Sequence, residues 1–177
     1  MRLSTLSLIA LLAPSVVFAA GSSSSNPPTT TQTASECKAG QVFDEKTESC
    51  VDKSSSLIDD DQRYEAVREL AYAGQYQRAL GVLDVMDEAD SRVLTYRGFI
   101  ARKTGDMEAA MQFYAAALDA NADNILARSY MGQGLVEAGD RTGAKLQLAE
   151  IRARGGRNTW AEVSLKTAIA TGVGSTY

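Results

Sequence analysis

The stretch 91–124 reads SRVLTYRGFIARKTGDMEAAMQFYAAALDANADN, and the next stretch, 125–158, repeats its spacing. The identical positions are Gly98 and Gly132, Gly105 and Gly139 (139 − 105 = 34), Asp106 and Asp140, and Ala110 and Ala144. Four coincident identities at one period indicate an internal repeat. Repeats of this length are typical of stacked supersecondary units that bury a continuous core between neighbours.

Each unit is expected to form two helices joined by a tight turn. The glycine of the central Gly-Asp pair suits the left-handed residue that follows a helix, and the aspartate can cap the helix that begins next. Gly98 and Gly132 would lie in the middle of a helix, where glycine costs about 1 kcal/mol relative to alanine. We therefore expect two helices to approach closely at each of these glycines.

This pattern resembles the tetratricopeptide repeat family, whose period is also 34 residues. The signature positions are occupied by Leu94, Gly98, Ala110, Tyr114 and Ala117 in one unit, and by Gly132, Leu135, Ala144 and Leu148 in the next. The resemblance implies an all-α fold, a right-handed solenoid of about three helical hairpins with a C-terminal capping helix. The chain departs from the family pattern at Arg97, Ala122 and Arg128.

A weaker unit precedes the two good ones. Its helices are expected at 64–73 and 76–86, and its turn glycine, Gly74, lies 105 − 74 = 31 residues before Gly105. The connection to the next unit is therefore three residues short of the period. After the repeats, the amphipathic segment 160–171 is expected to cap the stack with Trp160, Val163, Leu165 and Ile169, because an open end would be insoluble. The predicted repeat domain covers 57–171, as units 57–90, 91–124 and 125–158 and a cap at 159–171, before a tail at 172–177.

The N-terminus is expected to be a signal peptide, 1–19. Arg2 forms a short basic region, a largely apolar run follows, and small residues allow cleavage after Ala19 or Ala20. The apolar run is shorter than the roughly 20 residues that span a bilayer, so we predict a periplasmic or secreted protein without stable membrane insertion. The segment 20–36 is rich in Ser and Thr with almost nothing apolar, and a disordered linker is expected there.

The chain has two cysteines, Cys37 and Cys50. In an exported chain an isolated pair is expected to form a disulfide, which stabilises a loop of this size by about 3 kcal/mol. The segment 37–56 would then be a disulfide-closed hairpin with short strands on either side of a turn. It resembles the C-terminal knuckle of peritrophin-type chitin-binding domains at Cys37, Gly40, Val42, Phe43, Asp44, Thr47 and Cys50. That family builds its sugar site with six cysteines, so a structural clip is favoured over a glycan site.

The composition argues against catalysis and against nucleic-acid binding. The chain has no His, and its 18 Lys and Arg against 22 Asp and Glu give a net charge of −4, without the basic surface that nucleic acids require. The dense carboxylate run Asp59-Asp60-Asp61 lies where a helix is expected to begin, and the helix dipole explains it without catalysis. We predict a protein that is not an enzyme, with no catalytic residue, no cofactor and no metal site.

In tetratricopeptide proteins the first helix of each hairpin lines a concave groove that binds a peptide or a partner helix. The equivalent positions, called the stripe below, are Tyr64, Arg68, Tyr72, Arg92, Thr95, Phe99, Arg102, Lys103 and Gln133. The resemblance thus implies a non-catalytic interaction adaptor or scaffold in a pilus, secretion or envelope assembly. Its partner would be a protein or peptide, acidic and carrying apolar side chains.

Two alternatives remain beside this interpretation. The stripe can be an ordinary solvated helix face, because such mixed faces are usual. The protein can also be a cell-wall or glycan binder that uses the Cys37–Cys50 knuckle, with the helices as a spacer. The sequence leaves the identity of the partner and the oligomeric state open.

Overall fold

The computed structural model describes residues 31–174, which form eight helices and one two-stranded antiparallel sheet. The elements are α1 Thr33–Glu36, β1 Gln41–Asp44, β2 Ser49–Asp52, α2 Asp60–Tyr72, α3 Tyr76–Leu83, α4 Ser91–Lys103, α5 Met107–Ala120, α6 Ile125–Glu137, α7 Arg141–Ala153 and α8 Trp160–Thr171. The predicted signal peptide, most of the predicted linker and the end of the tail lie outside the described residues. The mostly helical fold with a small disulfide-closed hairpin is confirmed.

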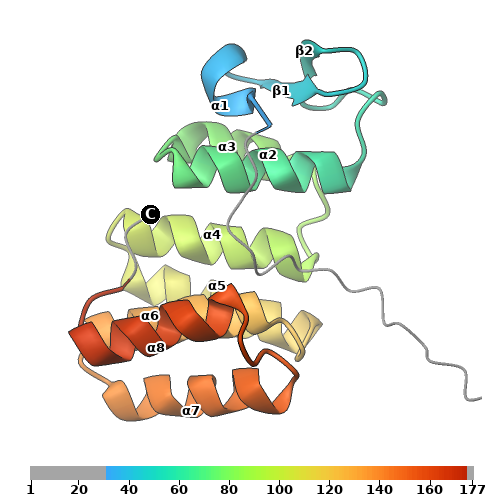
Figure 1. Cartoon of the computed structure of the whole chain (residues 1–177). Coiled ribbons are helices and arrows are strands. Elements are labelled where there is room, and N and C mark those ends of the chain that lie inside the picture. Colours follow the sequence, from blue (N-terminus) through green and yellow to red (C-terminus); the bar gives the residue numbers. More distant parts are fainter. Residues whose placement is uncertain (1–30, 175–177) are drawn as a thin grey trace, which may run out of the picture.

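Neighbouring helices in the chain are neighbours in space (Figure 1). The strongest contacts join α2 to α3, α4 to α5 and α6 to α7, and α4 also contacts α2 and α6. The last helix, α8, packs against α6 and α7. The sheet and α1 lie at one end of the molecule, beside α2, whereas α7 and α8 form the other end (Figure 1).

The same turn joins the two helices in each of the three helical pairs. Gly74, Gly105 and Gly139 have positive φ angles of 70°, 95° and 85°, a conformation that glycine adopts at little cost. The N–H of the residue after each glycine donates to a carbonyl five residues earlier, as Asp106 does to Ala101 over 2.9 Å. This is the Schellman ending of a helix. The predicted left-handed glycines are therefore confirmed.

The predicted aspartate caps are also confirmed. Asp106 accepts a hydrogen bond from the N–H of Ala109, and Asp140 accepts one from the N–H of Gly143. Each carboxylate thereby satisfies a backbone N–H that has no partner within its helix. These caps fix where α5 and α7 begin.

The two mid-helix glycines do mark close approaches between helices. A Cβ on Gly98 would lie 2.6 Å from a ring carbon of Tyr114 in α5, and a Cβ on Gly132 would lie 2.6 Å from Leu165 in α8. The neighbour differs because α7 has Leu148 at the position that Tyr114 occupies in α5. The space over Gly132 is filled instead by the side chain of Leu165 in α8. A Cβ at either position would therefore force a buried neighbouring side chain to shift.

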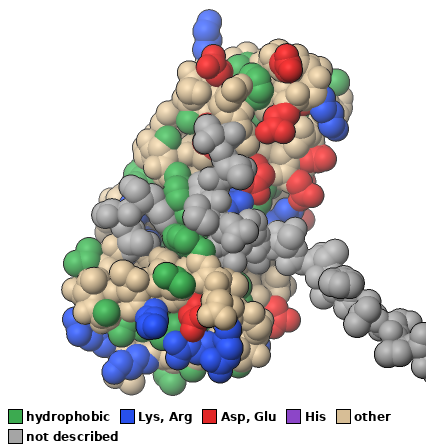
Figure 2. All heavy atoms as spheres, in the orientation of Figure 1, with side chains coloured by type: hydrophobic (Ala, Val, Ile, Leu, Met, Phe, Trp, Pro, Cys, Tyr) green, Lys and Arg blue, Asp and Glu red, His purple; other side chains and the backbone are tan. Residues whose placement is uncertain are grey.

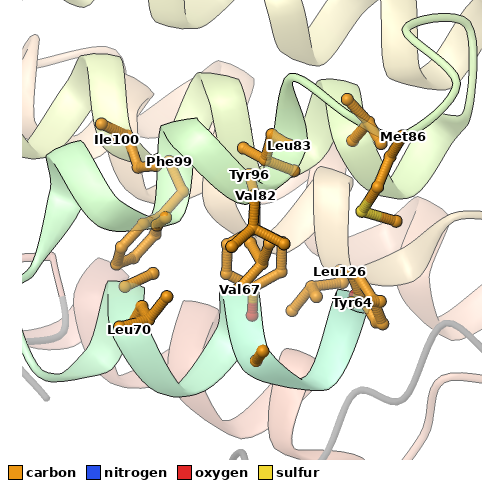
Figure 3. Close-up of a cluster of buried hydrophobic side chains, with 14 of the residues drawn as sticks. Tyr64, Val67, Leu70, Val82, Leu83, Met86, Tyr96, Phe99, Ile100 and Leu126 are labelled. Carbon is orange, nitrogen blue, oxygen red and sulfur yellow. The ribbon is translucent and has the colours of Figure 1, made fainter. Parts of the chain in front are cut away.

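A continuous apolar core runs from the sheet to α6. Figure 3 shows Tyr64, Val67 and Leu70 of α2 facing Tyr96 and Phe99 of α4. A second cluster of buried side chains, Val136, Ala144, Leu148, Ile151, Leu165 and Ala168, joins α6, α7 and α8. The predicted capping residue Val163 is not part of it, because 54% of its surface is exposed, whereas Leu165 is fully buried.

The predicted linker 20–36 is too long at its C-terminal end, since α1 forms within it. The buried carboxylate of Glu69 in α2 accepts the N–H groups of Thr33 (3.2 Å) and Ala34 (2.9 Å) at the start of α1. Arg78 in α3 donates to carbonyl groups of α1 and its C-cap, including those of Thr33 (2.8 Å) and Cys37 (2.9 Å). An anion at the start and a cation at the end complement the dipole of this short helix.

The disulfide-closed hairpin is built into the helical body. Cys37 and Cys50 are bonded, and Val42 pairs with Val51 across the two strands. Val42 is 1% exposed and belongs to the main core, while Lys53 donates to the carbonyl of Gly81 in α3 over 2.7 Å. The hairpin is therefore anchored on α2 and α3.

Two helix boundaries differ from the prediction by three or more residues. α2 begins at Asp60, four residues before Tyr64, because Asp59 and Gln62 form a reciprocal capping box. α3 ends at Leu83, three residues before Met86. The first helical pair therefore has a much shorter second helix than the others.

Candidate functional site

The predicted stripe lies on α2, α4 and α6, but most of it is interior. Six of its nine side chains are buried: Tyr64, Arg68, Thr95, Phe99, Arg102 and Gln133. The other three, Tyr72, Arg92 and Lys103, are half-buried. A partner could not reach the six buried residues in this conformation. As a binding surface the stripe stays a prediction, whereas the structure shows that its buried residues pack in the interior.

Aromatic rings of the stripe pack against other aromatic rings across successive helices. Tyr64 of α2 contacts Tyr96 of α4 with ring centroids 5.6 Å apart, and Phe99 contacts Tyr130 of α6 at 5.0 Å. Tyr130 reaches Trp160 of α8 at 6.1 Å. Such tilted and edge-on contacts add about 0.5–1.5 kcal/mol each beyond area burial. These rings therefore join the helices to one another.

The arginines of the stripe are paired with carboxylates of the same chain. Arg68 bonds Glu65 over 2.7 Å, and Arg102, whose side chain is 1% exposed, bonds Glu137 over 2.6 Å. Each of these guanidinium groups also lies near a ring of the stripe. An acidic partner would have to displace an existing carboxylate from such an arginine.

Arg92 is the most accessible of the three arginines and also has carboxylate partners. It lies 2.7 Å from Asp61 and 2.8 Å from Asp90. Burial acts to raise the pKa of Asp90, but hydrogen bonds from Arg92 outweigh it and hold this pKa below its usual value. Burial lowers the pKa of Lys103, and the adjacent charge of Arg102 adds to the effect.

The polar residues of the stripe belong to buried networks. Thr95 donates to the carbonyl of Ser91 over 2.6 Å and accepts from the amide of Asn124 over 3.0 Å. Gln133 donates to Ser164 of α8 over 3.0 Å. Polar groups that are buried and bonded in this way are costly to break, because the remaining partners would stay unsatisfied. The sequence pattern did not predict these networks.

An accessible hollow lies on a different part of the surface, between α3, α4 and α5. Its larger part, about 540 Å³, is lined by Glu88, Ala89, Leu94, Arg97 and Phe113. A smaller part, about 220 Å³, is lined by Leu80, Arg97, Ile100, Ala101, Thr104, Asp106, Ala109 and Phe113. The two parts share Arg97 and Phe113. We call the combined hollow the Phe113 groove.

The short second helix of the first pair accounts for the Phe113 groove. α3 has 8 residues, whereas its counterpart α5 has 14. Since α3 stops at Leu83, the half-buried Leu94 and Phe113 are left without a helix over them. The step of 31 residues between Gly74 and Gly105, against 34 for the next pair, was the sequence signal for this gap.

The rim of the Phe113 groove is acidic. Glu88 and Asp106 line it and are exposed. Its cation, Arg97, bonds Asp84 over 2.9 Å. Exposed pairs of this kind contribute only about 0–1 kcal/mol, so a partner can rearrange Arg97 cheaply. The groove therefore suits apolar side chains flanked by basic ones.

The carboxylate run Asp59-Asp60-Asp61 is explained by structure. Asp59 caps α2, Asp60 bonds Arg63 over 2.8 Å, and Asp61 bonds Arg92. Within residues 31–174, no group of three or more His, Cys, Asp or Glu side chains is arranged to hold a metal ion. In the same range, no helix has the length and apolar character needed to cross a membrane.

Two of the positions that depart from the repeat pattern contact each other. Arg128 is 8% exposed and donates to the carbonyl of Ala122 over 2.8 Å. It thereby ties the α5–α6 loop to α6.

Comparison of the chain with models of protein families, with curated protein sequences and with solved structures gave no match.

Proposed function

We propose that this chain is a non-catalytic adaptor that binds a protein or peptide in the Phe113 groove. The observation that carries the proposal is an open hollow, lined by Leu94 and Phe113, on helices that are otherwise well packed. A rigid scaffold with a preformed apolar hollow binds at low entropic cost. The stripe predicted from the sequence is less favoured, since most of it is buried.

We propose in addition that the helical pairs are tetratricopeptide hairpins, stacked as a right-handed solenoid that α8 caps. Support comes from the 34-residue step between two of the turns and from the identical Schellman endings at Gly74, Gly105 and Gly139. The contacts of α8 with α6 and α7 fit the role of a cap.

The chemistry of the groove favours a partner segment with apolar and basic side chains. Leucine or aromatic side chains would fill the space against Leu94 and Phe113. Lysine or arginine residues of the partner would lie near Glu88 and Asp106. This differs from the acidic partner expected from the stripe, whose arginines are paired within the chain.

The disulfide supports an exported location, because such bonds persist in oxidising compartments. A periplasmic or secreted adaptor would act within an envelope, secretion or pilus assembly. The alternative glycan binder gains no support from the fold. Its knuckle is fastened to α2 and α3 by hydrogen bonds of Arg63, Arg78 and Lys53, and it does not stand apart on a helical spacer.

The proposal is tested by recovery of partners from envelope extract. The tagged wild-type protein is compared with Leu94→Asp, which places a charge in the groove, and with Leu57→Asp as a matched control. Leu57 is 58% exposed and lies before α2, away from the groove. We expect the wild type and Leu57→Asp to recover the same proteins and Leu94→Asp to lose them. Equal recovery by all three, with circular dichroism showing folded variants, would exclude the groove.

A further inference from the structure

Charge is distributed unevenly along the molecule. Residues 31–90 contain six basic and 14 acidic residues, a net charge of −8, whereas residues 125–174 contain seven basic and four acidic residues, a net charge of +3. Residues 91–124 are balanced, with four of each. Figure 2 shows Asp and Glu side chains over the sheet and α2, and Lys and Arg side chains gathered over α7 and α8. The two ends thus carry opposite charge.

The basic end presents cations that form no salt bridge with a described carboxylate. Arg141, Lys145, Arg157 and Lys166 are exposed and form no ion pair with any described carboxylate. By contrast, Arg152 of the same end bonds Glu162 over 2.6 Å, and Arg154 bonds Glu150 over 3.0 Å. The free cations come from α7, α8 and the loop that joins them.

The basic end also exposes apolar side chains. Leu146 of α7 is 63% exposed, and Val163 of α8 is 54% exposed. Val173, directly after α8, is 62% exposed. Three of the five large hydrophobic residues that are exposed in the described part of the chain therefore lie here. Exposed apolar residues beside free charges are typical of surfaces that bind proteins.

The opposite end offers a surface that matches both properties. A hollow of about 600 Å³ beside α1 and the hairpin is lined by Glu36, Phe43, Glu45 and Glu48, together with Thr31 and Gln32. The three glutamates are exposed, and none forms an ion pair with a described residue. The half-buried ring of Phe43 provides an apolar contact among them. Lys38 and Lys46 also lie in this region, so the surface is acidic in net terms only.

We propose that two copies of this chain associate head to tail. The α7–α8 end of one copy binds the acidic surface around Phe43 of the next. The occupant is a second copy because both complementary surfaces belong to the same chain, at opposite ends of the molecule (Figures 1 and 2). Such an interface is heterologous, so each copy keeps a free surface for a further neighbour and association continues beyond the dimer. The Phe113 groove takes no part in it.

The strength of this association depends on salt. The net charge of −4 makes two copies repel at long range, but at about 0.1 M salt the Debye length is about 10 Å, so contacting surfaces dominate. Higher salt also screens the contacts between the two ends. We therefore expect reversible association at low salt and its loss at high salt.

Sedimentation velocity of the purified protein at 50 and 500 mM NaCl tests this proposal. It is compared with a basic-end variant, Lys145→Glu/Arg157→Glu/Lys166→Glu, and with an acidic-end variant, Glu36→Lys/Glu45→Lys/Glu48→Lys. All six side chains are exposed, and circular dichroism verifies that the variants fold. The wild type should form dimers and longer chains at 50 mM NaCl and be monomeric at 500 mM.

The variants separate this interface from other contacts. Each variant alone should be monomeric at both salt concentrations, because its two contact surfaces carry charge of the same sign. In the acidic-end variant the surface around Phe43 becomes basic, although residues 31–90 as a whole keep a net charge of −2. An equimolar mixture of the two should associate again at 50 mM NaCl, since the unaltered acidic surface of one variant can bind the unaltered basic end of the other, and the two reversed ends also attract each other. A wild type that stays monomeric at 50 mM NaCl and 200 µM would overturn the proposal. So would single variants that associate as the wild type does, or a mixture that remains monomeric.

Discussion

Substitution of Gly98 by alanine isolates the close approach between α4 and α5. In an open helix the change stabilises by about 1 kcal/mol, because alanine loses less backbone entropy than glycine. At Gly98 the new Cβ would lie 2.6 and 2.7 Å from two ring carbons of Tyr114 and 3.2 Å from the carbonyl oxygen of Ala110. Tyr114 is fully buried, so its ring can shift only within the packed core. Overpacking of this kind costs about 1–3 kcal/mol.

The net effect of Gly98→Ala is therefore a loss of about 1 kcal/mol in the free energy of unfolding. This corresponds to a decrease in Tm of about 3 °C for a chain of this size. Gly81→Ala in α3 is the matched control, because its Cβ would meet only Lys53 Nζ, at 3.5 Å. The control should gain about 0.5–1 kcal/mol. Urea and thermal unfolding followed by circular dichroism measure both variants.

A double-mutant cycle with Tyr114→Ala tests the cause. Once the ring is removed, the same Gly98→Ala change should stabilise by at most about 1 kcal/mol, because the gain in helix propensity is then opposed only by the 3.2 Å contact with the carbonyl oxygen of Ala110. If Gly98→Ala raises Tm as much as Gly81→Ala does, or if its effect is the same with and without the Tyr114 ring, the close-packing argument is wrong.

Three further predictions concern the N-terminal clamp, the disulfide and pH. Glu69→Gln should cost about 1–3 kcal/mol, because a neutral amide replaces the charged acceptor of the N–H groups of Thr33 and Ala34, and hydrogen exchange in α1 should speed up. The Cys37→Ser/Cys50→Ser variant should lose about 3 kcal/mol in urea unfolding, through the freed loop of 13 residues, and unchanged stability would contradict a structural role. Hydrogen bonds from Arg152 and from the N–H of Asn158 lower the pKa of Glu162. The charged Glu162 therefore stabilises the fold above its unfolded pKa of about 4.3, and this stabilisation is lost as the pH falls through the folded pKa. Glu162→Gln should thus be less stable than the wild type at pH 7, with a difference that shrinks below about pH 4 in thermal unfolding.

The turns and the disulfide could be predicted because their causes are local. A left-handed position after a helix needs Gly105 or Gly139 whatever surrounds it, and Asp106 caps a helix that begins next to it. The spacing of the mid-helix glycines likewise predicted close contacts, although not that Leu165 of α8 would be the neighbour of Gly132. Periodicity identifies positions within a helix better than it identifies their partners.

The stripe and α1 show what local patterns miss. A repeat position indicates which side of a helix a residue occupies, but it does not tell whether Phe99 faces solvent or the ring of Tyr130. The composition of 20–36 predicted disorder, which is wrong for α1. The residues that hold α1 in place, Glu69 and Arg78, lie more than 30 residues away in the chain, so the local composition could not indicate them. The 31-residue step between Gly74 and Gly105 indicated that the first helical pair is shorter than the others. It did not indicate where α3 ends, and the position of the Phe113 groove depends on that end.

Site-specific photo-cross-linking tests the claim of a binding groove most directly. A benzophenone amino acid is placed at Leu94 or Phe113 in the groove, and at the exposed Gln112 beside it as a control for reactivity. The protein is expressed in cells of its native host, and the intact cells are irradiated. We predict a discrete adduct with one partner from positions 94 and 113 and none from position 112. Adducts of equal yield from all three positions, or from position 112 alone, would contradict the Phe113 groove as the binding surface.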